Sequence, residues 1–79
     1  MILTGKALED FLEWYGELET YFYRLNTTCK HTLIIEWLDS VGVWDGVFYE
    51  VYIESTPTTE FKQILNKAIM TANEIYNGL

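Results

Sequence analysis

The stretch VWDGVFYEVYIE, residues 43–54, decides which fold class the sequence predicts. From residue 47 onward its side chains fall into two alternating sets, Val47, Tyr49, Val51 and Ile53 in one and Phe48, Glu50, Tyr52 and Glu54 in the other. Such alternation is typical of a half-buried β-strand, and we expect the first set to face the core. Asp45-Gly46 favours a two-residue hairpin turn, which would pair Val43-Trp44 with the start of this strand.

Helical periodicity covers the rest of the chain in three segments. After a predicted N-cap at Thr4, the first segment repeats apolar residues at steps of three and four. These residues are Leu8, Phe11, Leu12, Tyr15, Leu18, Phe22 and Leu25. A second helix is predicted between a cap at Thr28 and a stop at Gly42, because these residue types favour helix ends. A third is predicted from Pro57 to Asn77-Gly78.

These elements predict a single α+β domain over residues 1–79, with three helices packed on a small antiparallel hairpin in the order α-α-β-β-α. Most of the strand at 47–53 has no partner within the chain, and an uncovered strand edge invites pairing. We therefore expect a homodimer in which two copies of the strand complete a larger sheet across a two-fold axis. The alternative is a monomer whose third helix covers the strand edge.

Charge and cysteine usage narrow the class of protein. The 79 residues carry 12 Asp and Glu against 5 Lys and Arg, a formal net charge of −7. Phosphate binding needs clustered bases, so neither nucleic acid nor an anionic membrane is an expected partner. No apolar run approaches the roughly 18 residues that span a membrane, and no signal-peptide pattern is present. The one cysteine, Cys29, fits a reducing compartment, so we expect a cytoplasmic protein.

The residue types that carry chemistry do not form a catalytic pattern. Cys29 and His31 are two residues apart, and side chains at that spacing do not face each other on a helix. They are the only soft metal ligands, and a zinc site needs three or four. The five glycines fit neither a dinucleotide-binding nor a phosphate-binding loop. The sequence therefore predicts a non-enzymatic protein without a metal or cofactor.

Two surfaces are predicted to bind another protein. The first is a ribbon on the outer face of the predicted strand, where aromatic and acidic side chains alternate: Phe48, Glu50, Tyr52 and Glu54. Tyr and Trp are favoured interface anchors. The second is an acidic row at steps of three and four along the first helix: Glu9, Asp10, Glu13 and Glu17. This row is open to three interpretations, namely a solvated face, a surface for a basic partner, or a divalent-cation site.

Three stretches resemble a loose family of small uncharacterised proteins from phages of Bacteroides-type gut bacteria, including crAss-like phages. They are LTGKALEDFLEWY at 3–15, IIEWLDSVGV at 34–43 and KAIMTANEIYN at 67–77. The matching positions are Lys6, Ala7, Asp10, Phe11, Trp14 and Tyr15, then Trp37, Asp39, Ser40, Val41 and Gly42, then 72–77. The resemblance implies no known activity. The family has a longer strand region after Gly42, and its shortening here favours pairing between chains.

Together these observations predict a small acidic phage accessory protein that binds a host or phage protein in the host cytoplasm. Its sharpest form is an inhibitor of a defence protein that imitates the charge of DNA through the acidic row. The alternative is a minor virion or scaffold component that self-assembles through strand pairing. An enzyme or small-ligand binder has the least support, because no convergent polar pocket is visible in the sequence.

Overall fold

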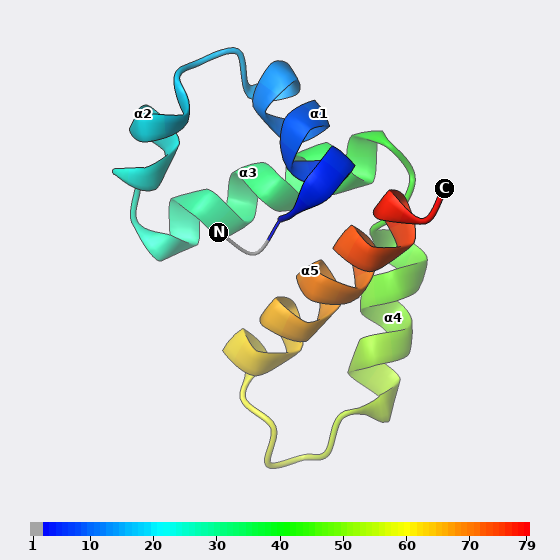
Figure 1. The fold of residues 1–79 in the computed structure, drawn as a ribbon. Coiled ribbons are helices and arrows are strands. Elements are labelled where there is room, and N and C mark those ends of the chain that lie inside the picture. Colours follow the sequence, from blue (N-terminus) through cyan, green and yellow to red (C-terminus); the bar gives the residue numbers. More distant parts are fainter. Residues whose placement is uncertain (1–2) are drawn as a thin grey trace.

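The computed structural model describes residues 3–79 and builds them from helices alone. In chain order the helices are α1 (Gly5–Tyr15), α2 (Glu19–Tyr23), α3 (Thr27–Ser40), α4 (Asp45–Glu54) and α5 (Phe61–Asn77). Helices α4 and α5 lie side by side and run in opposite directions, while α1 contacts both α3 and α5 (Figure 1). Because no strand occurs between residues 3 and 79, the predicted α+β fold and its α-α-β-β-α order are wrong.

The alternating stretch forms helix α4, so the predicted strand and hairpin are corrected to a helix. In a strand every second side chain lies on the same face, and in a helix side chains four residues apart do so. Val47 and Val51 are four residues apart, so they share a face in either conformation. In α4 these two side chains turn inward beside Phe48, whereas Tyr49 and Ile53, expected in the core, are exposed. A helix also satisfies its own backbone hydrogen bonds, which an unpaired strand would leave open.

This correction removes the structural basis for the predicted homodimer. The dimer was expected because residues 47–53 would present an uncovered strand edge. In α4 the same backbone groups bond within the helix, and the helix packs along α5. Within residues 3–79 there is no strand left to pair with a second copy.

The first predicted helix is divided into two. Helix α1 ends at Tyr15, and Gly16 follows with φ 75°, in the left-handed region that glycine adopts without strain. The Gly16 N–H donates to the Leu12 carbonyl at 3.1 Å, which closes the helix end. After the break, the short helix α2 turns Phe22 into the core. One apolar stripe in the sequence therefore becomes two inward faces.

The second and third predicted helices are confirmed, with shifted starts. Helix α3 is capped by Asn26 rather than Thr28, because Asn26 Oδ1 accepts from the Cys29 N–H at 2.8 Å. Helix α5 begins at Phe61, so Pro57 lies in the preceding loop. There the Glu60 N–H donates to Gln63 Oε1 at 3.2 Å, one half of a capping box.

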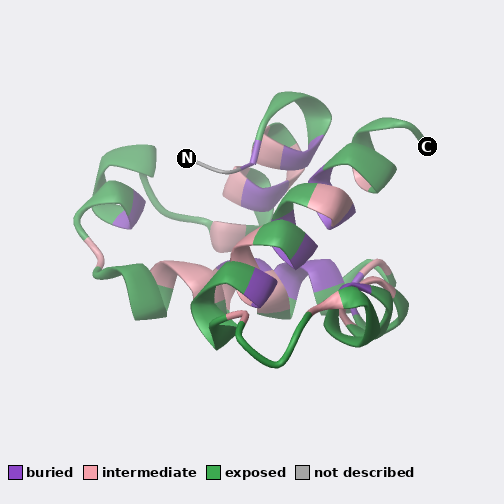
Figure 2. Ribbon diagram, turned by 90° about the horizontal axis from the view of Figure 1, so that it is seen from below, coloured by how far each residue is buried: buried purple, intermediate pink, exposed green. Residues whose placement is uncertain are grey.

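An aromatic cluster centred on Phe11 joins four of the helices. The Phe11 ring is fully buried, and its centroid lies 5.1 Å from that of Phe22, 5.9 Å from that of Trp37 and 6.0 Å from that of Tyr15. The Trp37 ring in turn meets Tyr76 of α5 edge-on at 4.9 Å. The buried residues lie on the inward sides of the helices, where these elements cross (Figure 2).

Two asparagines of α5 complete the first turn of α1. The Thr4 N–H donates to Asn73 Oδ1 at 2.9 Å, and the Ala7 N–H donates to Asn77 Oδ1 at 2.8 Å. The amide nitrogens donate in return, Asn73 Nδ2 to Thr4 Oγ1 at 3.1 Å and Asn77 Nδ2 to the Thr4 carbonyl at 2.9 Å. Thr4, the predicted N-cap, makes no side-chain cap bond to its own helix. We call these four residues the asparagine junction.

Replacing Gly46 tests the helix at 45–54 directly. In the first turn of α4 no heavy atom lies within 4 Å of an added Cβ, and Gly46 has no positive φ. We expect Gly46→Ala to raise the free energy of unfolding by about 0.5–1 kcal/mol, because Ala is the better helix former. In the predicted hairpin turn, which needs positive φ, the same change would lower it. Gly16→Ala should lower it by about 1–2 kcal/mol. Urea unfolding followed by circular dichroism measures the free energy of unfolding of the two variants and of the wild type. A destabilised Gly46→Ala variant would contradict the helix.

Removing one arm of the asparagine junction tests its contribution to stability. Asn77→Ala leaves the Ala7 N–H and the Thr4 carbonyl without these partners, so we expect a loss of about 1–2 kcal/mol. For a domain of this size that lowers the melting temperature by about 5 °C or more. Glu74→Ala, an exposed position on the same helix, is the control and should change it little. Equal melting temperatures for the two variants would show that the junction contributes nothing.

Candidate functional site

Three large side chains stand exposed on one side of α4. Tyr49, Tyr52 and Ile53 are 64%, 54% and 59% exposed. Residues three and four apart are neighbours on a helix surface, so these three form one continuous patch, which we call the α4 face. Large apolar side chains that are exposed at adjacent positions mark an interaction surface more often than isolated ones do.

The predicted ribbon is divided by the helix. Phe48 and Tyr52 remain neighbours, with ring centroids 6.2 Å apart, and Phe48 is half-buried beneath the α4 face. A step of two residues turns a helix by roughly 200°, so Glu50 and Glu54 leave that side. Both glutamates are exposed and four residues apart, and they form an acidic edge next to Ile53. The four predicted residues thus lie on one helix but on two of its sides.

Aromatic rings beneath the α4 face hold it in place. Trp44 is buried and stacks on Phe48, with centroids 5.5 Å apart. Phe48 also meets the ring of Phe61 edge-on at 6.2 Å. Since Phe61 is itself 61% exposed at the start of α5, the apolar surface continues from α4 onto that helix.

A hollow of about 470 Å³ opens beside the α4 face. It is lined by Tyr52 and Ile53 of α4, by Ser55, Thr56, Pro57 and Thr59 of the following loop, and by Ile64 of α5. Hydrogen bonds within the loop hold its part of the lining, since the Thr56 N–H donates to Thr59 Oγ1 at 3.2 Å and the two hydroxyl oxygens lie 2.9 Å apart. The hollow is open to solvent, so a partner side chain could pack against Tyr52 and Ile53 there.

The predicted acidic row of Glu9, Asp10, Glu13 and Glu17 does not form one surface. Glu9 and Glu13 are exposed on α1, whereas Asp10 turns toward α5 and Glu17 lies beyond the end of the helix. Within residues 3–79 no three carboxylate, imidazole or thiol side chains are grouped as they would be around a metal ion. Of the four predicted acids, two, Glu9 and Glu13, are therefore exposed side by side on α1.

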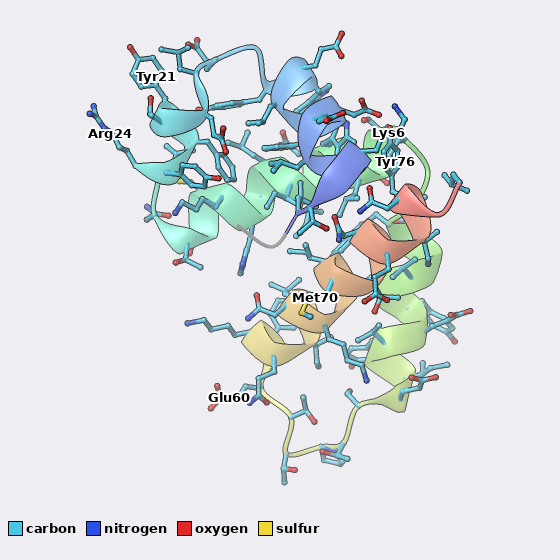
Figure 3. All side chains as sticks on the ribbon, viewed as in Figure 1. Lys6, Tyr21, Arg24, Glu60, Met70 and Tyr76 are labelled. Carbon is cyan, nitrogen blue, oxygen red and sulfur yellow. The ribbon has the colours of Figure 1, made fainter. Side chains whose placement is uncertain are left out.

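Asp10 belongs to a network between α1 and α5. Tyr76 donates its hydroxyl proton to Asp10 Oδ2, and Lys6 Nζ lies 3.1 Å from the same oxygen. Figure 3 shows Lys6 and Tyr76 together where the start of α1 meets the end of α5. The Tyr76 bond, followed by that from Lys6, lowers the pKa of Asp10. The bond to Asp10 likewise raises the pKa of Tyr76.

His31 and Cys29 point to no shared chemistry. Cys29 is exposed in the first turn of α3. His31 is half-buried in a cleft between α3 and α5, and burial, followed by the charge of Lys62, lowers its pKa below the ordinary 6.5. The predicted separation of the two residues on a helix agrees with their position in α3.

Sequence reasoning missed Tyr49, Ile53 and Phe61 as surface residues. A period of two along this stretch predicts Tyr49 and Ile53 in the core. A helical projection of residues 45–54 would have grouped them with Tyr52 at steps of three and four. The exposure of Phe61 has no such signal, because its spacing fits the apolar stripe of its own helix.

Comparison with known proteins adds no relative. No family model, curated protein or solved structure matches the chain. Within residues 3–79 each helix is too short or too polar to cross a membrane. Residues far apart in the sequence meet between α1, α3 and α5, since Asp10 bonds to Tyr76, Phe11 packs on Trp37 and Asn77 caps Ala7. The α4 face lies outside these contacts.

The Asp10–Tyr76 bond predicts an acid-sensitive contribution to stability. A carboxylate whose pKa is lowered by folding stabilises the fold above its ordinary pKa, here 3.8, and loses that contribution as the pH falls through the lowered value. Tyr76→Phe should therefore destabilise the protein near neutral pH and make less difference well below pH 3.8. Urea unfolding at both pH values measures this, with Tyr49→Phe as the exposed control. A cost that does not change with pH would refute the role of the carboxylate.

Proposed function

We propose that this chain is a non-enzymatic binding protein whose α4 face docks on a basic surface of another protein. The observation that carries the proposal is the exposure of Tyr49, Tyr52 and Ile53 as one patch beside a hollow. Tyrosine supplies large contact area at low cost in side-chain entropy, which makes it a frequent anchor. In the setting that the family resemblance implies, the partner is a host or phage protein in the bacterial cytoplasm.

Charge supports a basic partner. Glu50 and Glu54 border the α4 face, and the whole chain carries a net charge of −7. Complementary charge at the edge of an apolar patch speeds encounter and excludes acidic competitors. Partner Lys or Arg side chains would meet the glutamates and also pack over the tyrosine rings, where a cation is attracted to the ring face.

The α4 face supports the proposal better than the acidic row of α1 does. Asp10 is engaged with Lys6 and Tyr76, and Glu17 is off the helix, so the row lacks the regular spacing that imitation of DNA would need. Self-assembly through strand pairing is not proposed, because residues 47–53 are helical.

Selection of binding peptides from a displayed random library tests the proposal without a known partner. We expect the enriched peptides to be rich in Lys and Arg and to carry an aromatic or aliphatic anchor. Their affinity should fall at least about tenfold on the double change Tyr52→Ser with Ile53→Ser. It should fall a few-fold on Glu50→Gln with Glu54→Gln, and more so at low salt.

Tyr21→Ser with Met70→Ser is the matched control, since it also removes one exposed tyrosine and one exposed aliphatic side chain. Tyr21 lies on α2 and Met70 on α5 (Figure 3). This variant should keep the wild-type affinity, and circular dichroism should show both double variants folded. Peptides without net positive charge, or peptides that bind the Tyr52→Ser/Ile53→Ser variant unchanged, would overturn the proposal.

A further inference from the structure

A second concave site lies between the first turns of α3 and α5. This cleft has a volume of about 330 Å³, and its lining is Thr27, Thr28, His31, Thr32, Ile35, Phe61, Lys62 and Leu65. A volume of this order lies at the small end of ligand-binding pockets. The site is distinct from the hollow beside the α4 face, with which it shares no lining residue.

The charge of the cleft is opposite to that of the protein. Its lining contains Lys62 and His31 and no acidic residue, although the chain as a whole has a net charge of −7. The two groups are close enough for the Lys62 charge to act on the imidazole. Because burial and Lys62 lower the pKa of His31 below 6.5, the imidazole is neutral at pH 7 and offers one N–H donor beside the ammonium group.

The remaining lining divides into a polar and an apolar part. Thr27 and Thr28 belong to the first turn of α3, where the helix dipole adds a partial positive charge. Ile35, Leu65 and Phe61 supply the apolar part. A ligand that satisfies both parts carries one negative charge at one end and an apolar body at the other. One lysine charge balances the single charge of a carboxylate, whereas a phosphate monoester carries a charge of about −1.5 to −2 at pH 7.

We propose that the α3/α5 cleft binds a small carboxylic acid with an aromatic or branched aliphatic body. The carboxylate would lie between the Lys62 ammonium group and the His31 imidazole, and the body would pack on Ile35 and Leu65. The cleft therefore gives this protein a small-molecule site in addition to its protein-binding surface. It does not depend on the α4 face, so either proposal can fail without the other.

The single histidine provides a local reporter, because its imidazole signals in a proton NMR spectrum need no assignment. Phenylacetate is the probe, and phenylacetamide is its uncharged counterpart. At neutral pH and constant ionic strength, we expect phenylacetate to shift the His31 signals saturably. Phenylacetamide should bind at least about fivefold more weakly, as should phenylacetate to the Lys62→Gln variant.

Lys67→Gln is the control variant, because Lys67 lies on the same helix but lines a different hollow, beside Glu54 and Ser55. It should bind phenylacetate as the wild type does. Lys62 and Lys67 are both exposed, so neither change should disturb the fold. Three results would each overturn the proposal: His31 signals that shift without saturation, equal binding of acid and amide, or a Lys62→Gln variant with wild-type affinity.

Discussion

The backbone N–H groups at the start of a helix have no partners within that helix, and in α1 two asparagines from the far end of the chain supply them. Asn73 and Asn77 are one helical turn apart on α5, so both amides reach the same first turn of α1. Each amide nitrogen also donates a hydrogen bond back to Thr4, which fixes the orientation of α1 relative to α5. Segments near the two ends of the chain are thereby joined by hydrogen bonds.

The aromatic cluster depends on this junction. With α1 held against α5, the ring of Phe11 reaches Trp37, and Trp37 reaches Tyr76 one residue before the capping Asn77. The Tyr76 hydroxyl then donates to the Asp10 carboxylate. The end of α5 therefore contributes the Asn77 amide as a cap, and the ring and the hydroxyl of Tyr76. The surfaces proposed for binding lie elsewhere.

Both proposed surfaces arise where helices are incompletely covered. Helix α4 is apolar around most of its circumference, and within residues 3–79 its main packing partner is α5, so Tyr49, Tyr52 and Ile53 remain outside. The start of α5 diverges from α3 and leaves the cleft that holds His31 and Lys62. A domain with a single small core has too few elements to cover every apolar face, and the uncovered faces are the ones proposed for binding.

By itself the sequence determined the helices at α3 and α5, the inward positions of Phe11 and Phe22, and the acidic balance. Periodicity and capping residues act within a few positions, so a local pattern is enough to identify them. Only the tertiary structure decided that residues 45–54 are helical, because Val47 and Val51 share a face in either conformation and packing along α5 selects the helix. Only the tertiary structure brings Asn73 and Asn77 to α1, because their hydrogen bonds to Thr4 and Ala7 join residues about seventy positions apart. Contacts at that separation leave no periodic trace in the sequence. The exposure of the α4 face was also decided by packing, because α4 packs along α5 with Val51 buried and leaves Tyr49, Tyr52 and Ile53 outside.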